Sequence, residues 1–151
     1  MDAAFGKCLS RLQRLCSKAE YCTADLYRKA LKDLEGDASA AAEVVSALVA
    51  ERYADDARYA AAFAREKALL QGWGPVKIRF QLRGKGIPEE AVAAALAQLS
   101  TDEAADRLDK LLAAKARSLA GDPQRRLKLI KYALSRGYEY DRAEAAVKKL
   151  L

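Results

Sequence analysis

Apolar residues recur along this chain at the spacing of α-helices, and short breaks divide the pattern into segments. It is clearest in the middle of the chain, where Tyr59, Phe63 and Leu70 form an apolar stripe on a helix expected over residues 56–71. Gly72-Trp73-Gly74 follows directly, and two glycines in three residues are expected to end such a helix. The middle of the chain therefore begins with one long amphipathic helix.

Two shorter helices are expected after this break. Pro75 suits the first position of a helix because the N–H that proline lacks would be unpaired there, and Gly86 suits the C-terminal cap. A third helix is expected to start at Pro88-Glu89-Glu90, with three residues facing inward: Val92, Leu96 and Leu99. These segments make up one three-helix unit.

The same plan is expected on both sides of this unit, with Pro123 opening a helix as Pro75 does. About a fifth of the residues are alanine, the strongest helix former, whereas glycine and proline are few, so no sheet is expected. The predicted fold class is all-α, with three tandem three-helix repeats that resemble helix-turn-helix units. Their expected bounds are 1–53, 54–100 and 101–151, and the flanking helices are expected at 2–17, 23–34, 38–52, 102–120, 123–136 and 140–150.

One segment has the alternation of a β-strand, since residues 76–83 are apolar and polar in turn. The proline before it and the glycine after it favour a helix, on which Val76 and Phe80 form one stripe while Ile78 and Leu82 form another, nearly opposite. Because a surface helix needs only one apolar face, the second stripe is expected to meet a neighbouring unit or a partner.

The last two units align with one another at a shift of 51 residues. Lys85 then matches Arg136, and Gly86 matches Gly137. Self-similarity at a fixed period is typical of repeat architectures.

Aromatic residues of the central unit are interpreted as packing residues. Tyr59 and Phe63 are expected in the core, and Trp73 is expected to anchor the turn, with stacking on a base or a partner side chain as the alternative. Tyr132 lies on the last basic helix, and Tyr138 and Tyr140 straddle the turn after it, so both packing and binding roles stay open for these three residues.

The amino-acid composition excludes most catalytic mechanisms. The chain has no histidine, which excludes serine–histidine and cysteine–histidine catalysis, and it has no glycine-rich phosphate loop. Three acidic pairs each open an expected helix, where carboxylates pair with free amides and favour the helix dipole: Asp55-Asp56, Glu89-Glu90 and Asp102-Glu103. The chain is predicted not to be an enzyme, and neither a metal nor another cofactor is expected.

The cysteines and the apolar runs indicate in which compartment of the cell the protein is expected. Cys8, Cys16 and Cys22 match no zinc motif and are interpreted as core thiols in a reducing cytosol. No apolar run is long enough to span a membrane, and residues 1–6 do not resemble a secretory signal. The predicted location is cytoplasmic, without membrane contact.

The net charge of +6 is unevenly distributed. Two windows hold five bases and no acid, one between Glu66 and Glu89 and the other between Asp122 and Glu139. Both windows cover the expected second helix of a unit. Because phosphates attract such surfaces by releasing counterions, the windows predict a nucleic-acid-binding face; a solvated face and contact with acidic protein are the alternatives. The candidate residues are Lys77, Arg79, Arg83, Lys85, Arg125, Arg126, Lys128, Lys131 and Arg136.

The central unit carries a specific sequence pattern, in which Gly72-Trp73-Gly74-Pro75 stands between a tyrosine-bearing helix and a basic helix. It is accompanied by Asp55-Asp56, Arg58-Tyr59-Ala60, Phe63, Ile78-Arg79, Leu82 and Lys85-Gly86-Ile87. Over roughly residues 50–100 this pattern resembles the central repeat of RecX proteins, bacterial regulators of the RecA recombinase. The resemblance implies a curved, elongated monomer that binds the RecA–single-stranded DNA filament and inhibits recombination, DNA repair and SOS functions of RecA by stoichiometric binding.

Two other functions remain as alternatives. A helix-turn-helix transcriptional regulator uses similar three-helix units, but it usually dimerises to meet paired half-sites, and no dimer seam is visible in this sequence. A helical-repeat scaffold that binds protein only is the third reading. Binding led by phosphate contacts would weaken steeply with salt and would not depend on base sequence. These two properties distinguish it from the transcriptional regulator and from the protein-binding scaffold.

Overall fold

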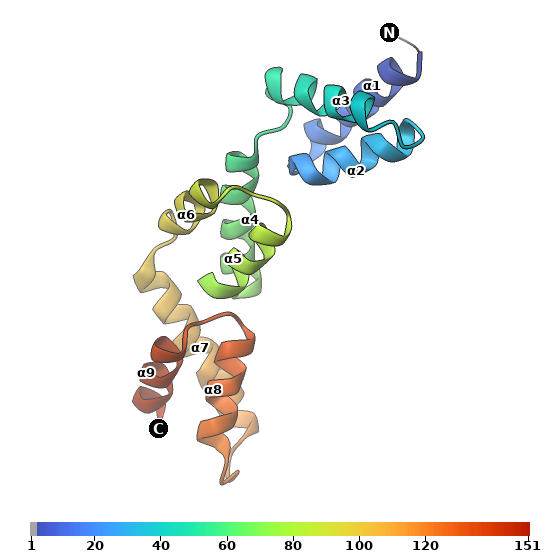
Figure 1. The fold of residues 1–151 in the computed structure, drawn as a ribbon. Coiled ribbons are helices and arrows are strands. Elements are labelled where there is room, and N and C mark those ends of the chain that lie inside the picture. Colours follow the sequence, from blue (N-terminus) through green and yellow to red (C-terminus); the bar gives the residue numbers. More distant parts are fainter. Residues whose placement is uncertain (1–2) are drawn as a thin grey trace.

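The computed structural model describes residues 3–151, and over that range the chain forms nine helices and no strand. The helices follow one another in groups of three along an elongated molecule (Figure 1). Their bounds are α1 Ala3–Lys18, α2 Thr23–Asp33, α3 Ala38–Ala50, α4 Asp56–Gln71, α5 Pro75–Gly84, α6 Glu89–Ala97, α7 Thr101–Ser118, α8 Arg125–Ser135 and α9 Tyr140–Leu150. The all-α prediction is confirmed.

Each group of three helices surrounds its own apolar core. Leu12, Leu26 and Leu48 are fully buried in the first group, and Leu129 and Val147 in the last. The divisions at residues 53/54 and 100/101 stay predictions, because the first and second groups share residues across their junction, as described below.

The buried face of α4 consists of alanine. Ala60, Ala64 and Ala68 are at most 1% exposed and follow one another at four-residue spacing, whereas Leu70 of the predicted stripe is 78% exposed. Small side chains let neighbouring helices approach closely, and α4 packs against α6 along this face. The predicted stripe was therefore wrong at Leu70, while Tyr59 and Phe63 pack against the edge of the central core as expected.

The strand-like segment is a helix. In α5, Ile78 and Leu82 are fully buried, whereas Val76 is 44% and Phe80 73% exposed. Pro75 occupies the first turn as predicted, and Gly86 follows the cap residue with φ +75°, a left-handed conformation that glycine adopts without strain. Only one of the two predicted stripes of α5 is buried.

The other two prolines do not occupy the first helical position. Pro88 is the N-cap of α6, and α8 begins at Arg125, two residues after Pro123. The cause at Pro123 is a local turn, in which the Asp122 carboxylate accepts a hydrogen bond from the Gln124 amide at 2.8 Å. The prediction that Pro123 opens the helix was wrong for this reason.

The junction between the central and last groups joins two backbones directly. The Gly74 amide donates to the Arg136 carbonyl at 2.8 Å, and the Val76 amide donates to the Gly137 carbonyl at 2.9 Å. The Tyr138 hydroxyl donates to the Gly72 carbonyl at 3.1 Å. The turn after α8 therefore docks on the turn that precedes α5.

The junction between the first and central groups involves the corresponding turns and is made through side chains. Lys85, in the turn after α5, pairs with Asp25 on α2 at 3.3 Å, and Gly86 lies beside Ala24. Asp56 accepts hydrogen bonds from both the amide and the hydroxyl of Thr23, each at 2.8 Å. Cys22 is buried in the core of the central group rather than that of its own. Successive units thus dock through equivalent turns.

Candidate nucleic-acid interface

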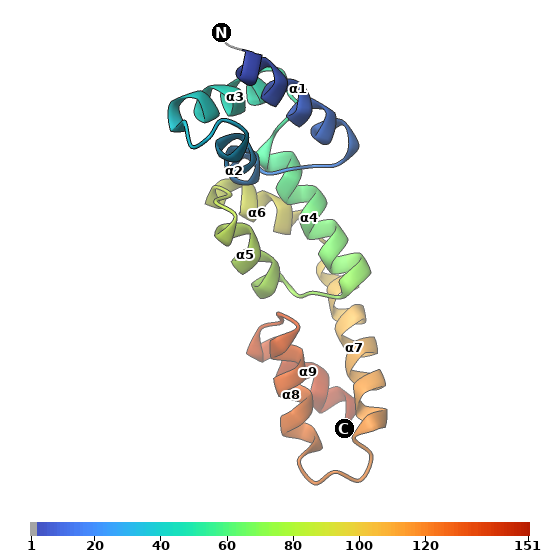
Figure 2. The same cartoon turned by 90° about the vertical axis from the view of Figure 1, so that its right-hand side faces the viewer.

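The second helix of each unit lies on the same side of the molecule. In two views related by 90°, α2, α5 and α8 follow one another down the long axis (Figure 1 and Figure 2). The docking of successive turns explains this alignment, because each contact joins the end of one second helix to the start of the preceding one. The candidate cations therefore belong to one row of helices.

The arginines of α5 share an acidic neighbour. Arg83 makes two hydrogen bonds to Glu89, at 2.8 and 3.0 Å, and Arg79 lies 3.9 Å from the same carboxylate. The hydrogen bond from Arg83 holds the pKa of Glu89 below its ordinary value, and Glu89 in turn raises the pKa of Arg83. Since both members of the Arg83–Glu89 pair are more than half exposed, the pair contributes little stability and exchanges readily for another anion.

Lys77 lies over an aromatic cluster. Its ammonium group is 4.4 Å from the centre of the Trp73 ring, and that of Lys67 is 5.1 Å from the same ring. Phe63 meets Trp73 edge-on at 6.2 Å. Trp73 is half-buried against the central core, so the expectation that it anchors the turn is confirmed.

Lys85 and Arg136 are engaged at the two junctions between units. Arg136 donates to the Gln71 carbonyl, and Lys85 pairs with Asp25. Burial by itself would lower the pKa of Lys85, but Tyr59 and Asp25 raise it overall, which keeps the ammonium group charged. The structure gives these two aligned candidates a role in holding the units together and does not bring them onto the outer face of the second helices.

The α8 candidates fall into a paired and an unpaired set. Lys128 contacts Asp122 at 2.6 Å and holds the pKa of that carboxyl below its ordinary value, and Arg126 lies 3.9 Å from Glu144. Arg125 and Lys131 make no ion pair within residues 3–151 and are exposed. These two side chains are available to an external anion without loss of an internal contact.

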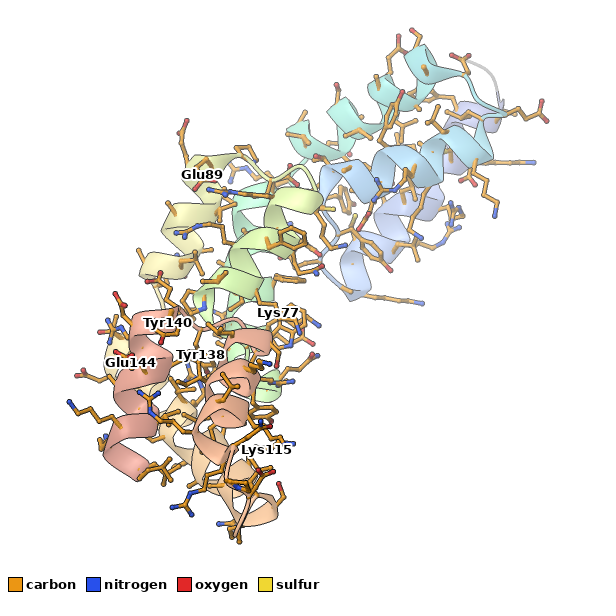
Figure 3. The ribbon with its side chains drawn as sticks, turned by 60° about the horizontal axis from the view of Figure 1, so that its bottom comes forward. Lys77, Glu89, Lys115, Tyr138, Tyr140 and Glu144 are labelled. Atoms are coloured by element: carbon orange, nitrogen blue, oxygen red, sulfur yellow. The ribbon has the colours of Figure 1, made fainter. Side chains whose placement is uncertain are left out.

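The tyrosines beside α8 differ in their surroundings. Figure 3 shows Tyr138 and Lys77, which come from different units, close to the place where these units meet. Tyr138 is 5% exposed, and burial raises its pKa. Tyr140 is half exposed and hydrogen-bonds to Glu144 one turn later on α9. Tyr138 is thus a junction residue, and Tyr140 lies on the surface.

Sequence reasoning did not include Phe80 or Arg28 among the candidates. Phe80 is the most exposed aromatic side chain of residues 3–151, and Arg28 lies on the exposed side of α2, where it pairs with Asp25. The alternation of residues 76–83 did contain the signal for Phe80, because it predicted a second apolar stripe that meets either a neighbouring unit or a partner.

The described part of the chain offers neither a membrane-spanning helix nor a metal-binding cluster. No helix in it is both long enough and apolar enough to cross a bilayer. No group of three or more acidic, cysteine or histidine side chains there is arranged to hold a metal ion.

The chain is similar to known proteins over most of its length. The family model described as RecX, second three-helix domain, matches residues 55–96. A regulatory protein RecX of Xanthomonas axonopodis pv. citri is 33% identical over 141 residues, which cover 93% of this chain and 85% of that protein. A regulatory protein RecX of Xanthomonas oryzae pv. oryzae is 39% identical over 95 residues, or 62% of this chain, and the match covers only 58% of that relative's length.

Solved structures agree with this similarity. A crystal structure of RecX from Lactobacillus salivarius superimposes with a TM-score of 0.85 at 19% identity, over 97% of this chain and 96% of that one. A second crystal structure, of a regulatory protein RecX, gives a TM-score of 0.86 at 26% identity, over 97% of this chain and 72% of that one. From the sequence relatives and the shared fold together, this chain belongs to the RecX family of regulatory proteins.

Proposed function

We propose that this protein binds RecA filaments assembled on single-stranded DNA and inhibits the recombinase by occupying them. It does so without catalysis, as a monomer and in the cytoplasm, where recombination and repair take place. Family membership supports a regulatory role. The observation that carries the rest is the row of second helices α2, α5 and α8 along one side of an elongated molecule (Figure 2). These helices carry exposed cations.

The elongated shape supports a filament as the target. A row of units presents cations at intervals along its length, and a filament presents repeating anionic groups in the same way. Arg125 and Lys131 on α8 are free of internal ion pairs over the described residues, and the exposed pair of Arg83 with Glu89 is easily exchanged. Contacts of this kind follow charge and spacing rather than base sequence.

The direct experiment is the DNA-dependent ATPase activity of RecA with increasing amounts of this protein. We expect the rate to fall as the protein concentration approaches that of RecA, because an inhibitor that acts by occupancy must match its target in amount. A constant rate at equal concentrations would contradict the proposal. Two further measurements then separate the alternatives. A comparison of DNA sequences identifies an operator-binding regulator, which prefers one sequence. A salt titration identifies phosphate-led binding, which weakens steeply as the salt concentration rises.

A further inference from the structure

We propose that Phe80 stacks on a base of single-stranded nucleic acid, flanked by phosphate contacts from neighbouring second helices. The inference deepens the proposed function, on which it rests, by naming one residue that touches the nucleic acid and the chemical group that it recognises. Its evidence is the position of Phe80 on α5, the charges around it and the equivalent positions in the other two units.

Phe80 points directly away from the core. Successive helical residues are rotated by about 100°, so Phe80 lies about 180° from the direction midway between Ile78 and Leu82. Those two residues are fully buried, whereas Phe80 is 73% exposed. Phe80 is not among the buried residues of the three cores. An exposed ring at the outermost point of a helix suits contact with an external flat surface.

The surroundings of Phe80 are cationic. Arg79 and Arg83 lie to one side of it around the helix and Lys77 to the other, and α5 itself contains no acidic residue. The ion pairs that Arg79 and Arg83 make are both with Glu89, the first residue of α6. An aromatic face between cations is the arrangement by which proteins bind single strands, because every base has a stacking face and every nucleotide a phosphate.

The equivalent positions in the other units carry cations. The buried pair Ile78 and Leu82 of α5 corresponds to Leu26 and Ala30 of α2 and to Leu129 and Ala133 of α8. By the same correspondence, Phe80 matches Arg28 on α2 and Lys131 on α8, and both are exposed. The outermost positions of the row therefore read cation, aromatic, cation. This order favours a nucleotide strand, with a base at the centre and phosphates on either side, over a protein surface.

The test uses two fluorescent oligonucleotides of equal length, one of deoxythymidine and one in which all bases are replaced by abasic sites. Both keep their phosphates, so only the first allows stacking. At low salt, we expect Phe80→Ala to weaken binding of the thymidine strand by roughly 5- to 150-fold, the usual range for loss of one stacked base. Binding of the abasic strand should not change. Phe80→Trp keeps a stacking face and should bind the thymidine strand like the wild type.

Leu70→Ala is the matched control, since Leu70 is 78% exposed and lies on α4 outside the basic row. It should bind both strands like the wild type. The salt dependence of Phe80→Ala should also keep the wild-type slope, because no phosphate contact is removed, whereas Arg83→Gln should make it shallower.

Three results would overturn the assignment. The first is a wild-type protein that binds neither oligonucleotide. The second is a Phe80→Ala variant whose affinity falls by the same factor for the thymidine and the abasic strand. The third is a Phe80→Ala variant that loses affinity for RecA filaments but not for free strands. The last result would make Phe80 an anchor for protein. Wild-type binding to RecA filaments is measured in parallel, so failure of the proposed function appears there and is distinguishable from failure at Phe80.

Discussion

Gly74 and Gly137 meet where the central and last units join, and neither position has room for a side chain. A Cβ atom on Gly137 would lie 2.3 Å from the Cβ of Lys77 and 2.8 Å from its backbone nitrogen. Gly137 also has φ +96°, in the left-handed region that other residues adopt only with strain. At the scale of single residues, the distance between two units is set by the absence of two side chains.

Gly137→Ala is therefore expected to destabilise the protein by more than the backbone strain alone would cause. Gly121→Ala is the control, because Gly121 has φ +81° and nothing within 4 Å of its Cβ position. We expect the control to lose about 1 kcal/mol of unfolding free energy and Gly137→Ala about 2 kcal/mol more, from the clash. Urea denaturation measures both, and equal losses would show that the junction is not tightly packed.

The cysteines give a second prediction at this scale. Burial, with a smaller contribution from Asp33, raises the pKa of Cys8 from its ordinary value of 9.0 to about 11. At pH 8 its thiolate population is then about 100-fold below that of an unperturbed thiol. Iodoacetamide should modify the half-buried Cys16 of the native protein before Cys8, as read by mass spectrometry; modification of Cys8 first would contradict its burial.

The same shift links stability to pH. The folded state keeps the Cys8 proton above pH 9, whereas the unfolded state releases it there. The contribution of Cys8 to stability is therefore fully present below pH 9 and is lost as the pH rises towards 11. Unfolding at pH 8 and pH 10.5, compared between wild type and Cys8→Ala, isolates this contribution, which should be absent from the variant.

At the scale of helices, periodicity predicted where the elements lie better than which residues they bury. The helices of the central unit follow from the Gly-Trp-Gly-Pro break and the glycine at position 86. The sequence did not show which face of α4 is buried, because alanine suits both the interior and the surface of a helix. Leu70 has the spacing of the predicted apolar stripe but is exposed. Pro123 was misleading because a side-chain turn at Asp122 delays the start of α8.

The docking of one element on the next gives a prediction at this scale. Tyr138→Phe keeps the ring but removes the hydrogen bond to the Gly72 carbonyl. Because Tyr138 is buried at the junction, we expect a loss of about 0.5–1.5 kcal/mol in unfolding free energy. Tyr140→Phe, at a half-exposed tyrosine with a surface partner, is the control and should lose less than about 0.5 kcal/mol. A larger loss at Tyr140 than at Tyr138 would speak against the docking described here.

At the scale of the whole molecule, the sequence predicted which helices carry the cations but not which contacts these cations make in the fold. Two acid-free windows at equivalent repeat positions predicted that the second helices carry the binding surface. The separation of Lys85 and Arg136 from the others depends on contacts between units, more than 40 residues apart in the chain, which no local pattern encodes. The row formed by α2, α5 and α8 likewise depends on the angle between units, and that angle follows from the junction contacts.

The outer face of the second helices is the proposed binding surface for the RecA–DNA filament. The most direct measurement compares filament binding by two variants of the last unit that change the same amount of charge. One is Arg125→Glu with Lys131→Glu on α8; the other is Lys110→Glu with Lys148→Glu on α7 and α9. All four side chains are exposed and make no ion pair within the described residues, so neither variant breaks an internal contact.

We expect the α8 variant to bind RecA–single-stranded DNA filaments at least about tenfold more weakly than the wild type, because it places repulsive charge in the interface. The α7 and α9 variant should stay within about threefold, since screening by salt leaves distant charges little effect. Circular dichroism should show that both variants keep their helices. Equal affinities for the two variants, whether both fall or neither does, would contradict the placement of the interface on the second helices.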